Sequence, residues 1–315
     1  MTDAKVAVVA VGGNALVKDK SKMTIADQYE AAQETMGHIV QMIKSGWNVI
    51  ISHGNGPQVG FILRRSELSA HELHPVPLDY CGADSQGAIG YMFQRALNNH
   101  FEEMGMDKHA CTVVTMVEVD RNDPAFENPT KPIGSFLDEA TAKERMAEGK
   151  TFVEDAGRGW RQVVPSPKPK RIVEVEPIHS LVENGFIVVA SGGGGIPVVE
   201  SEEGGLVGIE AVIDKDFASA LLAETIKADL LLISTAVEKV AINFNTPEVK
   251  WLDKMTIAEA KQYLAEGHFA PGSMKPKIEA CIDFLEKGGE KALITDPENI
   301  PRALNGETGT WIVKE

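Results

Sequence analysis

The chain has 315 residues, 43% of them hydrophobic, which is enough for one large two-lobed domain or two smaller ones. Its formal net charge of −15 repels nucleic acid and anionic lipid, so polyanion binding is excluded as the main function and no nucleic-acid partner is expected. A small anionic substrate remains possible only where positive charge gathers locally.

The three cysteines Cys81, Cys111 and Cys281 lie far apart and form no CxxC or His-paired spacing, so neither a disulfide framework nor a structural zinc site is expected. The first residues run from Lys5 into an apolar stretch without the pattern of a secretory signal. No apolar run approaches the roughly 18 residues that a membrane span needs. We therefore expect a cytoplasmic protein with no membrane partner.

Short apolar runs alternate with stretches of helical periodicity along the chain. Strands are predicted at 6–11, 47–52, 110–119, 186–190, 230–234, 240–244 and 292–295, and helices at 24–44, 84–104, 138–148, 216–228, 256–266 and 273–286. Thr24 with Asp27 three residues later suits a helix N-cap, and Gly46 suits a stop. This alternation predicts an α/β fold with a mainly parallel sheet covered on both faces.

One segment, from about residue 120 to 171, breaks the alternation. Its prolines are Pro124, Pro129, Pro132, Pro165, Pro167 and Pro169, and its basic residues include Lys131, Arg158, Arg161, Lys168, Lys170 and Arg171. The segment is either a long surface excursion or an inserted subdomain placed over a site. Long insertions in compact folds are more often functional than idle, which favours the second interpretation.

Three glycine-rich turns follow three of the predicted strands: Gly12-Gly13-Asn14, HGNGP at 53–57 and SGGGG at 191–195. Ligands of an open α/β sheet bind beyond the carboxyl ends of its strands. Glycine lets the backbone approach closely, and its free N–H groups bind oxyanions, to which Asn14 and Asn55 would add side-chain donors. One such turn would more often be purely structural, but three at equivalent strand ends favour an anion site.

The common nucleotide-binding fingerprints are absent from the sequence. No GxxxxGK[ST] occurs, which excludes a P-loop enzyme. The segment at 54–59 lacks the third glycine of a dinucleotide fingerprint and contains a proline, and the protein-kinase motifs are missing as well.

The segment Ile213-Asp214-Lys215-Asp216-Phe217 turns from a strand-like run into a helix. Asp216 either caps that helix or holds neighbouring lysines in place and keeps them charged, and the two roles are compatible. Lys215 would stand at the strand end, free to reach a phosphate.

A second lysine-bearing segment, PGSMKPK at 271–277, opens a helix. Lys275 and Lys277 in its first turns oppose the helix macrodipole; they are either solvated at a mild cost or neutralised by a bound anion. Phosphoryl transfer needs positive groups around a charge-rich transition state more than it needs an acid or a base. Lys131, Lys215 and Lys277 are therefore the best candidates for that chemistry.

These segments resemble the carbamate kinase branch of the amino-acid-kinase superfamily, over essentially the whole chain. The matching stretches are GGNAL at 12–16, GNGPQVG at 54–60, SQGAIGYM at 85–92, NPTKPIG at 128–134, GRGWRQVVPSPKP at 157–169, GGGIPV at 193–198, VIDKD at 212–216 and GHFAPGSMKPK at 267–277. The first and last are shared loosely with acetylglutamate, aspartate and uridylate kinases. NPTKPIG and GRGWRQVVPSPKP are specific, because they belong to the protruding subdomain that distinguishes carbamate kinases.

The resemblance implies an open three-layer αβα sandwich. A lobe at 1–210, with the protruding subdomain inserted at about 120–171, would bind carbamate or carbamoyl phosphate at Gly12, Gly13, Asn14, Gly54, Asn55, Gly193, Gly194 and Arg161. A lobe at 211–315 would bind MgADP or MgATP at Lys215, Thr235, Ala236, Val237, Phe244, Gly272, Ser273, Met274 and Lys277. Lys131, Lys215, Asp216 and Lys277 would be catalytic, in an in-line transfer with no covalent intermediate.

The resemblance further implies that Mg²⁺ bridges phosphate oxygens, with its protein ligands unassigned, and that the chain forms a homodimer. It also implies a role in arginine catabolism through the arginine deiminase pathway, or else in the supply of carbamoyl phosphate. We expect the insertion to act as a lid that brings Lys131 onto the transferring phosphoryl group; the alternative is a rigid surface module. Three positions depart from the family pattern: Asp84 in place of methionine, Ala236-Val237-Glu238 in place of a stretch with Val-Asp, and Lys275 in place of glycine. The competing functions are another acid kinase of the superfamily and a catalytically silent ligand sensor.

Overall fold

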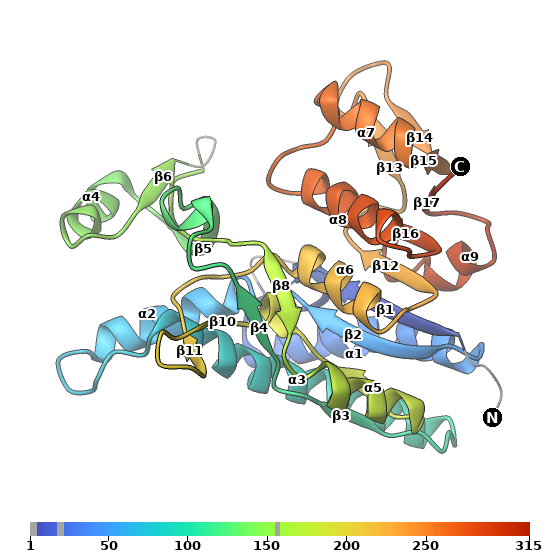
Figure 1. Cartoon of the computed structure of the whole chain (residues 1–315), viewed down its shortest axis with the longest axis horizontal. Coiled ribbons are helices and arrows are strands. Elements are labelled where there is room, and N and C mark those ends of the chain that lie inside the picture. The colour runs from blue at the N-terminus through green and yellow to red at the C-terminus, as the bar shows by residue number, and fades with distance from the viewer. Residues whose placement is uncertain (1–4, 18–21, 155–157) are drawn as a thin grey trace.

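The structure is a computed structural model that describes residues 5–17, 22–154 and 158–315, apart from the side chain of Asn14. Its main sheet has eight strands in the order β15-β17-β16-β12-β1-β2-β9-β3 (Figure 1). They are β1 (Val6–Val11), β2 (Asn48–His53), β3 (Ala110–Thr112), β9 (Ile187–Val189), β12 (Leu230–Ser234), β15 (Lys254–Thr256), β16 (Lys291–Thr295) and β17 (Thr310–Val313). All neighbouring pairs are parallel except β16 and β17. The predicted mainly parallel sheet is confirmed.

Helices cover both faces of this sheet, which gives three layers. One face carries α1 (Ile25–Lys44), α3 (Leu78–Glu103) and α9 (Ile300–Leu304), and the other carries α5 (Val175–Glu183), α6 (Lys215–Thr225), α7 (Ile257–Ala265) and α8 (Met274–Glu286). In β1 the side chains alternate between the two cores, Val8 and Ala10 into one and Ala7 and Val9 into the other. Because both faces are buried, the strands read as continuous apolar runs.

Helix α1 begins as its sequence predicts. The Thr24 Oγ1 accepts the Asp27 N–H at 3.2 Å, and the Asp27 carboxylate accepts the Thr24 N–H at 3.0 Å, which is a reciprocal capping box. Gly46 follows the helix with φ +99°, a conformation that glycine adopts without steric cost.

The single strand predicted at 110–119 is wrong. It consists of two strands, β3 and β4 (Met116–Val119), which belong to different sheets. Gln86 of α3 holds the chain between them: its side chain accepts the Thr115 N–H at 2.8 Å and donates to the Thr115 carbonyl oxygen at 3.0 Å. Strand β4 joins β8 (Pro169–Ile172), β10 (Ile196–Glu200) and β11 (Leu206–Gly208) in a four-stranded sheet.

Other expectations need smaller corrections. The strand predicted at 240–244 is β13 (Val240–Ile242), which pairs with β14 (Lys250–Leu252) in a hairpin outside the main sheet. Helix α3 begins at Leu78 rather than near residue 84, because Pro77 supplies the extended N-cap. The sequence did not predict α2 (Gln58–Ser69), whose apolar residues stand largely side by side instead of at helical spacing.

The protruding subdomain contains β5 (Lys131–Leu137), α4 (Glu139–Ala147), β6 (Phe152–Glu154) and β7 (Trp160–Val164). Its three strands form an antiparallel sheet of their own in the order β5-β7-β6. The subdomain stands away from the body of the molecule (Figure 1), whereas β8 at the end of the inserted segment is part of the four-stranded sheet.

Candidate active site

The three glycine-rich turns meet at one edge of the main sheet, as predicted. They follow β1, β2 and β9, which are adjacent and parallel, so their carboxyl ends lie together. There is little room for side chains at the glycines: a Cβ at Gly13 would lie 3.3 Å from the Gly56 carbonyl oxygen, and one at Gly193 would lie 2.3 Å from the side-chain Nδ2 of Asn55. The glycines therefore shape a surface of backbone groups at this edge.

Side chains of α3 fix these turns. The Asn55 side chain is buried and donates to the Ser85 hydroxyl at 3.3 Å. The Gln86 amide donates to the Gly192 carbonyl oxygen at 2.9 Å as well as holding Thr115. Ser85 and Gln86 were quoted in a family motif but not expected to serve the site. The sequence does contain a signal that could have identified them, because two adjacent polar residues stand on the apolar face of a predicted helix.

His53, the last residue of β2, was not predicted as a site residue. Its ring is buried, and one ring nitrogen lies 3.0 Å from the Gly54 carbonyl oxygen. Burial lowers the pKa of His53 to about 4, with a further contribution from the charge of Lys215, so the imidazole is neutral at physiological pH. A Cβ at Gly192 would lie 2.3 Å from this ring, which shows how closely the turn packs against it.

A buried charged triad stands at the starts of α6 and α8. Asp214 caps α6, because its carboxylate accepts the Asp216 N–H at 2.9 Å. The interpretation of Asp216 as the cap is therefore wrong. Its side chain has the other role expected of it, which is to hold the neighbouring lysines in place. Its Oδ1 accepts from the Lys215 Nζ at 2.7 Å and its Oδ2 from the Lys277 Nζ at 2.9 Å.

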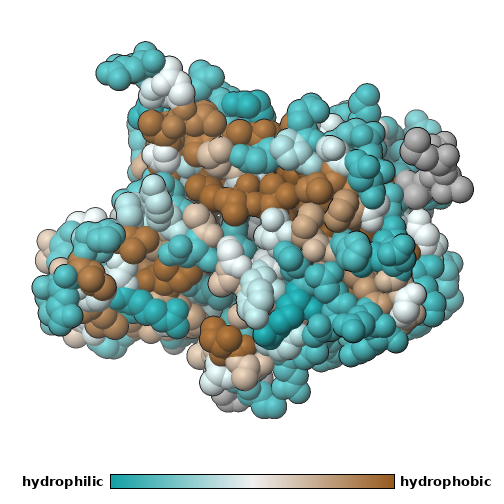
Figure 2. Space-filling view, turned by 90° about the horizontal axis from the view of Figure 1, so that it is seen from below, coloured by the Kyte–Doolittle hydropathy of each residue, from teal (hydrophilic) through white to brown (hydrophobic). Residues whose placement is uncertain are grey.

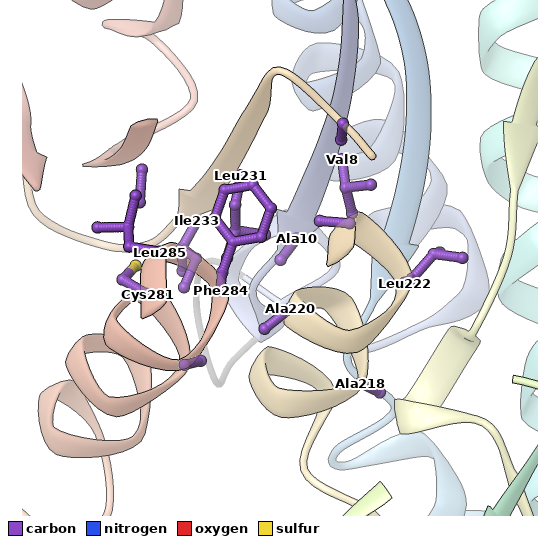
Figure 3. Close-up of a cluster of buried hydrophobic side chains, with 14 of the residues drawn as sticks. Val8, Ala10, Ala218, Ala220, Leu222, Leu231, Ile233, Cys281, Phe284 and Leu285 are labelled. Carbon is purple, nitrogen blue, oxygen red and sulfur yellow. The ribbon is translucent and has the colours of Figure 1, made fainter. Parts of the chain in front are cut away.

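Core packing brings the two helices together. Figure 3 shows Phe284 and Leu285 of α8 near Leu231 and Ile233 of β12, with Ala220 of α6 beside them. These side chains belong to one buried cluster, and α6 and α8 are in direct contact. The small alanine allows the close approach, and burial of the apolar side chains stabilises it. The site depends on this packing, since Asp216 and Lys277 are separated by 61 positions in the chain.

The charges of the triad support one another. Burial alone would raise the pKa of Asp216, but the two lysines outweigh it, so the carboxyl stays ionised with a lowered pKa. Burial lowers the pKa of Lys215 more than Asp216 raises it. At Lys277 burial also lowers the pKa, but the charge and hydrogen bond of Asp216 together with the charge of Asp214 outweigh it, and the pKa is raised. Two cations and one anion leave a net positive charge, close to two helix N-termini, and this favours binding of an anion.

The triad lies against the glycine turns and beneath the protruding subdomain. A Cβ at Gly54 would lie 3.6 Å from the Lys215 side chain. Lys131, the first residue of β5, pairs its Nζ with the Asp214 carboxylate at 2.5 Å, across 83 positions of the chain. The four residues predicted to be catalytic are thus gathered at the start of α6.

A cavity of about 450 Å³ opens beside Lys277. Of the predicted nucleotide-binding residues, its walls contain Thr235, Ala236, Val237, Phe244, Ser273, Met274 and Lys277. The walls also contain Lys239 and Ala241, which lie within the predicted adenine-binding stretch 235–244, and the residues Asn245, Trp251, Gly267, His268, Phe269 and Ala270, which were not predicted. The predicted residues Lys215 and Gly272 do not line the cavity. Phe244 and Trp251, about half exposed, meet edge to face with ring centroids 6.2 Å apart. A planar aromatic ligand fits against such a pair.

Two predicted site residues are not placed by this arrangement. Arg161 lies on β7 within the protruding subdomain, where its guanidinium donates to the Gly134 carbonyl oxygen at 3.2 Å. The Asn14 side chain lies outside the described residues. Both therefore remain predictions.

Of the residues that depart from the family pattern, Ala236 and Val237 line the cavity, whereas Asp84, Glu238 and Lys275 do not. Asp84 is exposed on α3. Glu238 accepts from the Thr308 hydroxyl at 2.5 Å and is not part of the cavity wall. Lys275 faces Glu279 at 3.9 Å rather than the cavity.

The described residues contain no group of three His, Cys, Asp or Glu side chains placed to hold a metal ion. A magnesium ion held mainly by nucleotide phosphates and water needs no such group. Within the same residues, no helix combines the length and the apolar character that crossing a membrane requires.

Comparison with known proteins places the chain in a family. The model of the amino acid kinase family matches residues 5–296. The carbamate kinase-like protein YahI of Escherichia coli K12 is 51% identical, with 98% of each chain covered. Carbamate kinase of Thermococcus kodakarensis is 50% identical, covering 98% of this chain and 99% of the relative. The solved structure of Giardia lamblia carbamate kinase bound to AMP-PNP is 41% identical, covers all of both chains and superposes with a TM-score of 0.93.

The fold, the charged triad and these matches together define a phosphotransferase of the αβα kinase type. The chain belongs to the amino acid kinase family, within its carbamate kinase branch.

Proposed function

We propose that the protein catalyses reversible phosphoryl transfer between carbamoyl phosphate and ADP, which gives ATP and carbamate. The observation that carries the proposal is the position of the Lys215–Asp216–Lys277 triad. The triad lies against the glycine-rich turns on one side. On its other side, Lys277 forms part of the wall of the 450 Å³ cavity. Phosphoryl transfer requires positive groups at the point where two anionic substrates meet.

In this proposal carbamoyl phosphate binds at the turns that contain Gly12, Gly13, Gly54, Asn55 and Gly193. The magnesium nucleotide occupies the cavity, with its adenine against Phe244 and Trp251 and its phosphates toward Lys277. An oxygen of the ADP β-phosphate attacks the phosphorus in line, and the bond to the carbamate oxygen breaks. The triad stabilises negative charge on the transferring group, and no protein nucleophile is needed.

The magnesium ion enters with the nucleotide as part of that substrate. It usually keeps several waters and takes only one or two carboxylates besides phosphate oxygens, which suits a site without a cluster of acidic ligands. When bound, it neutralises phosphate charge. Because Asp216 is already held by two lysines, we assign its role to orienting them rather than to binding the metal.

Lys131 would complete the site from the protruding subdomain. Its ammonium group is paired with Asp214 at the start of α6 and is 30% exposed, so it is near the triad while remaining accessible. We propose that a bound phosphoryl group takes over this ammonium from Asp214. The subdomain would then cover the labile acyl phosphate and exclude water during transfer.

The test is an ATP-formation assay with carbamoyl phosphate and MgADP. A parallel assay supplies MgATP with acetylglutamate or aspartate as the phosphoryl acceptor. Carbamoyl phosphate is expected to give ATP and the two amino-acid substrates no turnover. Robust phosphorylation of a larger acid without carbamoyl phosphate activity would support another acid kinase. A folded protein that binds these ligands without turnover would support a sensor.

We further propose that the chain is divided into a carbamate lobe at 1–210 and a nucleotide lobe at 211–315, that the protein is cytoplasmic and that it serves arginine catabolism.

We also propose that the protein forms a homodimer. Support for the dimer comes from exposed apolar side chains, including Tyr80 and Tyr91 on α3 and Val114 after β3. Figure 2 shows apolar side chains gathered on the face seen from below. Light scattering that gives a mass near the 34.1 kDa of one chain at micromolar concentration would refute the dimer.

A further inference from the structure

Helix α2 joins the substrate-type turn to the base of the protruding subdomain. It begins at Gln58, three residues after Asn55, and ends at Ser69. Its 12 residues form one rod about 18 Å long. A displacement of the glycine turn that precedes α2 is therefore transmitted along the helix to the residues that its C-terminal half contacts.

The first contact of α2 with the subdomain is between backbones. A Cβ built on Gly60 would lie 2.2 Å from the Gly134 Cα and 2.3 Å from the Gly134 nitrogen, so neither a side chain nor water separates the two segments. Gly134 lies on β5, three residues after Lys131, and has φ +69°. This close approach forms a pivot near the base of the strand that carries Lys131.

The second contact is electrostatic and lies two helical turns further along α2. The Glu67 Oε2 accepts from the Arg145 Nη1 of α4 at 2.9 Å, and its Oε1 lies 3.9 Å from the Lys150 Nζ. The Arg145 and Glu67 side chains are only 14% and 23% exposed. Such shielding makes the attraction stronger than that of an ordinary surface pair.

A cavity of about 190 Å³ lies between α2 and the subdomain, with Leu63, Ile133 and Phe152 in its walls and Gly60, Gly134, Glu67 and Arg145 among its lining residues. The subdomain therefore meets α2 at the Gly60–Gly134 backbone contact, at a buried apolar cluster that contains Val59 and Ile133, and at the ion pair, with incompletely filled space beside them. The unfilled space leaves room for rotation about the Gly60–Gly134 contact, and the ion pair is one of the contacts that oppose such rotation.

We propose that Glu67 and Arg145 are positioning residues for phosphoryl transfer. Their ion pair, called the latch below, holds the protruding subdomain on α2, so that Lys131 stays aligned with the start of α6. Because α2 begins at the Gly54–Asn55 turn, occupation of that turn and the placement of Lys131 are mechanically linked. The inference rests on the proposed function for its kinetic test, but not for its structural test.

The kinetic test compares Glu67→Gln and Arg145→Gln with Glu139→Gln. Glu139 is a matched control because it lies on α4 and pairs within that helix, with Lys143 at 2.7 Å, where the two side chains are 61% and 66% exposed. Each latch variant is expected to lower kcat about fivefold, on the order of one partly buried charge pair, with the KM for ADP unchanged. The double variant should lose no more than the larger single loss. Equal losses in Glu139→Gln, or additive losses in the double variant, would overturn the proposal.

The structural test measures amide hydrogen exchange on the full-length chain without substrates. In Glu67→Gln, amides of β5 and β7 should exchange faster while those of β12 and α6 remain unchanged. Gly60→Ala, which inserts a methyl group at the pivot, should have the same local effect. Unchanged exchange in β5 and β7 in both variants would refute the latch even if wild-type turnover is normal. If wild type lacks carbamoyl phosphate turnover but the exchange pattern holds, the proposed function fails and the latch stands.

Discussion

Removing the negative charge of Asp216 is the most informative perturbation of the site. Asp216→Asn keeps the side chain's shape but leaves Lys215 and Lys277 facing a neutral group. The Asp216 side chain is 4% exposed and those of the two lysines are 11% and 13% exposed, so water does little to screen their repulsion. Loss of one partner from a buried pair costs roughly 3–5 kcal/mol.

The expected loss of folding free energy lies near the lower end of that range, at about 3 kcal/mol, because Lys215 can lose its proton and so remove the repulsion between the two lysines. Burial already lowers the pKa of Lys215, so this lysine gives up its proton most easily when the carboxylate is gone. The unfolded chain then binds more protons than the native state at pH values between the lowered pKa of Lys215 and the usual lysine pKa. Stability of the variant should therefore rise with pH up to that value, which partly restores the loss.

The assay is thermal unfolding followed by circular dichroism at pH 7 and pH 9.5, with turnover measured in parallel. A drop in Tm on the order of 5–10 °C is expected at pH 7, with a smaller drop at pH 9.5. Asp214→Asn is the control, because that carboxylate is more exposed, at 20%, and asparagine caps a helix equally well. A Tm for Asp216→Asn within 1–2 °C of wild type, or a deficit that grows with pH, would refute the buried-triad argument.

Four further outcomes are expected. Lys215→Ala and Lys277→Ala should each cost on the order of 2–4 kcal/mol of transition-state stabilisation with the fold intact by circular dichroism, and near-wild-type turnover would remove either from the mechanism. Lys131→Ala should lower turnover strongly while calorimetry shows nearly unchanged ADP affinity; a loss explained wholly by ADP binding would contradict its role. Trp251→Ala should raise the KM for ADP about two- to tenfold without changing that for carbamoyl phosphate, and equal changes in both would argue against stacking. Because the pKa of His53 falls from the usual 6.5 to about 4, native stability should decrease by about 3 kcal/mol as the pH is lowered across that interval, and His53→Gln should flatten this dependence of Tm.

Features that depend on neighbouring residues were readable from the sequence. The capping box of Thr24 and Asp27, the apolar face of α8 and the glycine turns all express local preferences within a few positions. Parallel strand order then follows from alternation of strands and helices, which is why the meeting of the three turns could be predicted.

Features that depend on long-range packing were not readable in the same way. The segment at 110–119 has continuous strand character, but the side chain of Gln86 divides it between two sheets. Trp251 reaches the nucleotide-type cavity only because the β13–β14 hairpin folds back beside α8. The ion pair of Glu67 and Arg145 joins two helices that are 78 positions apart at that point.

The sequence by itself therefore determined the class of fold, the turns that can bind anions and the lysines able to meet a phosphate. Only the tertiary structure decided that Asp214 caps α6 while Asp216 binds Lys215 and Lys277. Both aspartates satisfy the local preference for a helix start, so periodicity cannot separate them. The choice is made where α8 packs against α6, because that contact brings Lys277 to the Asp216 carboxylate.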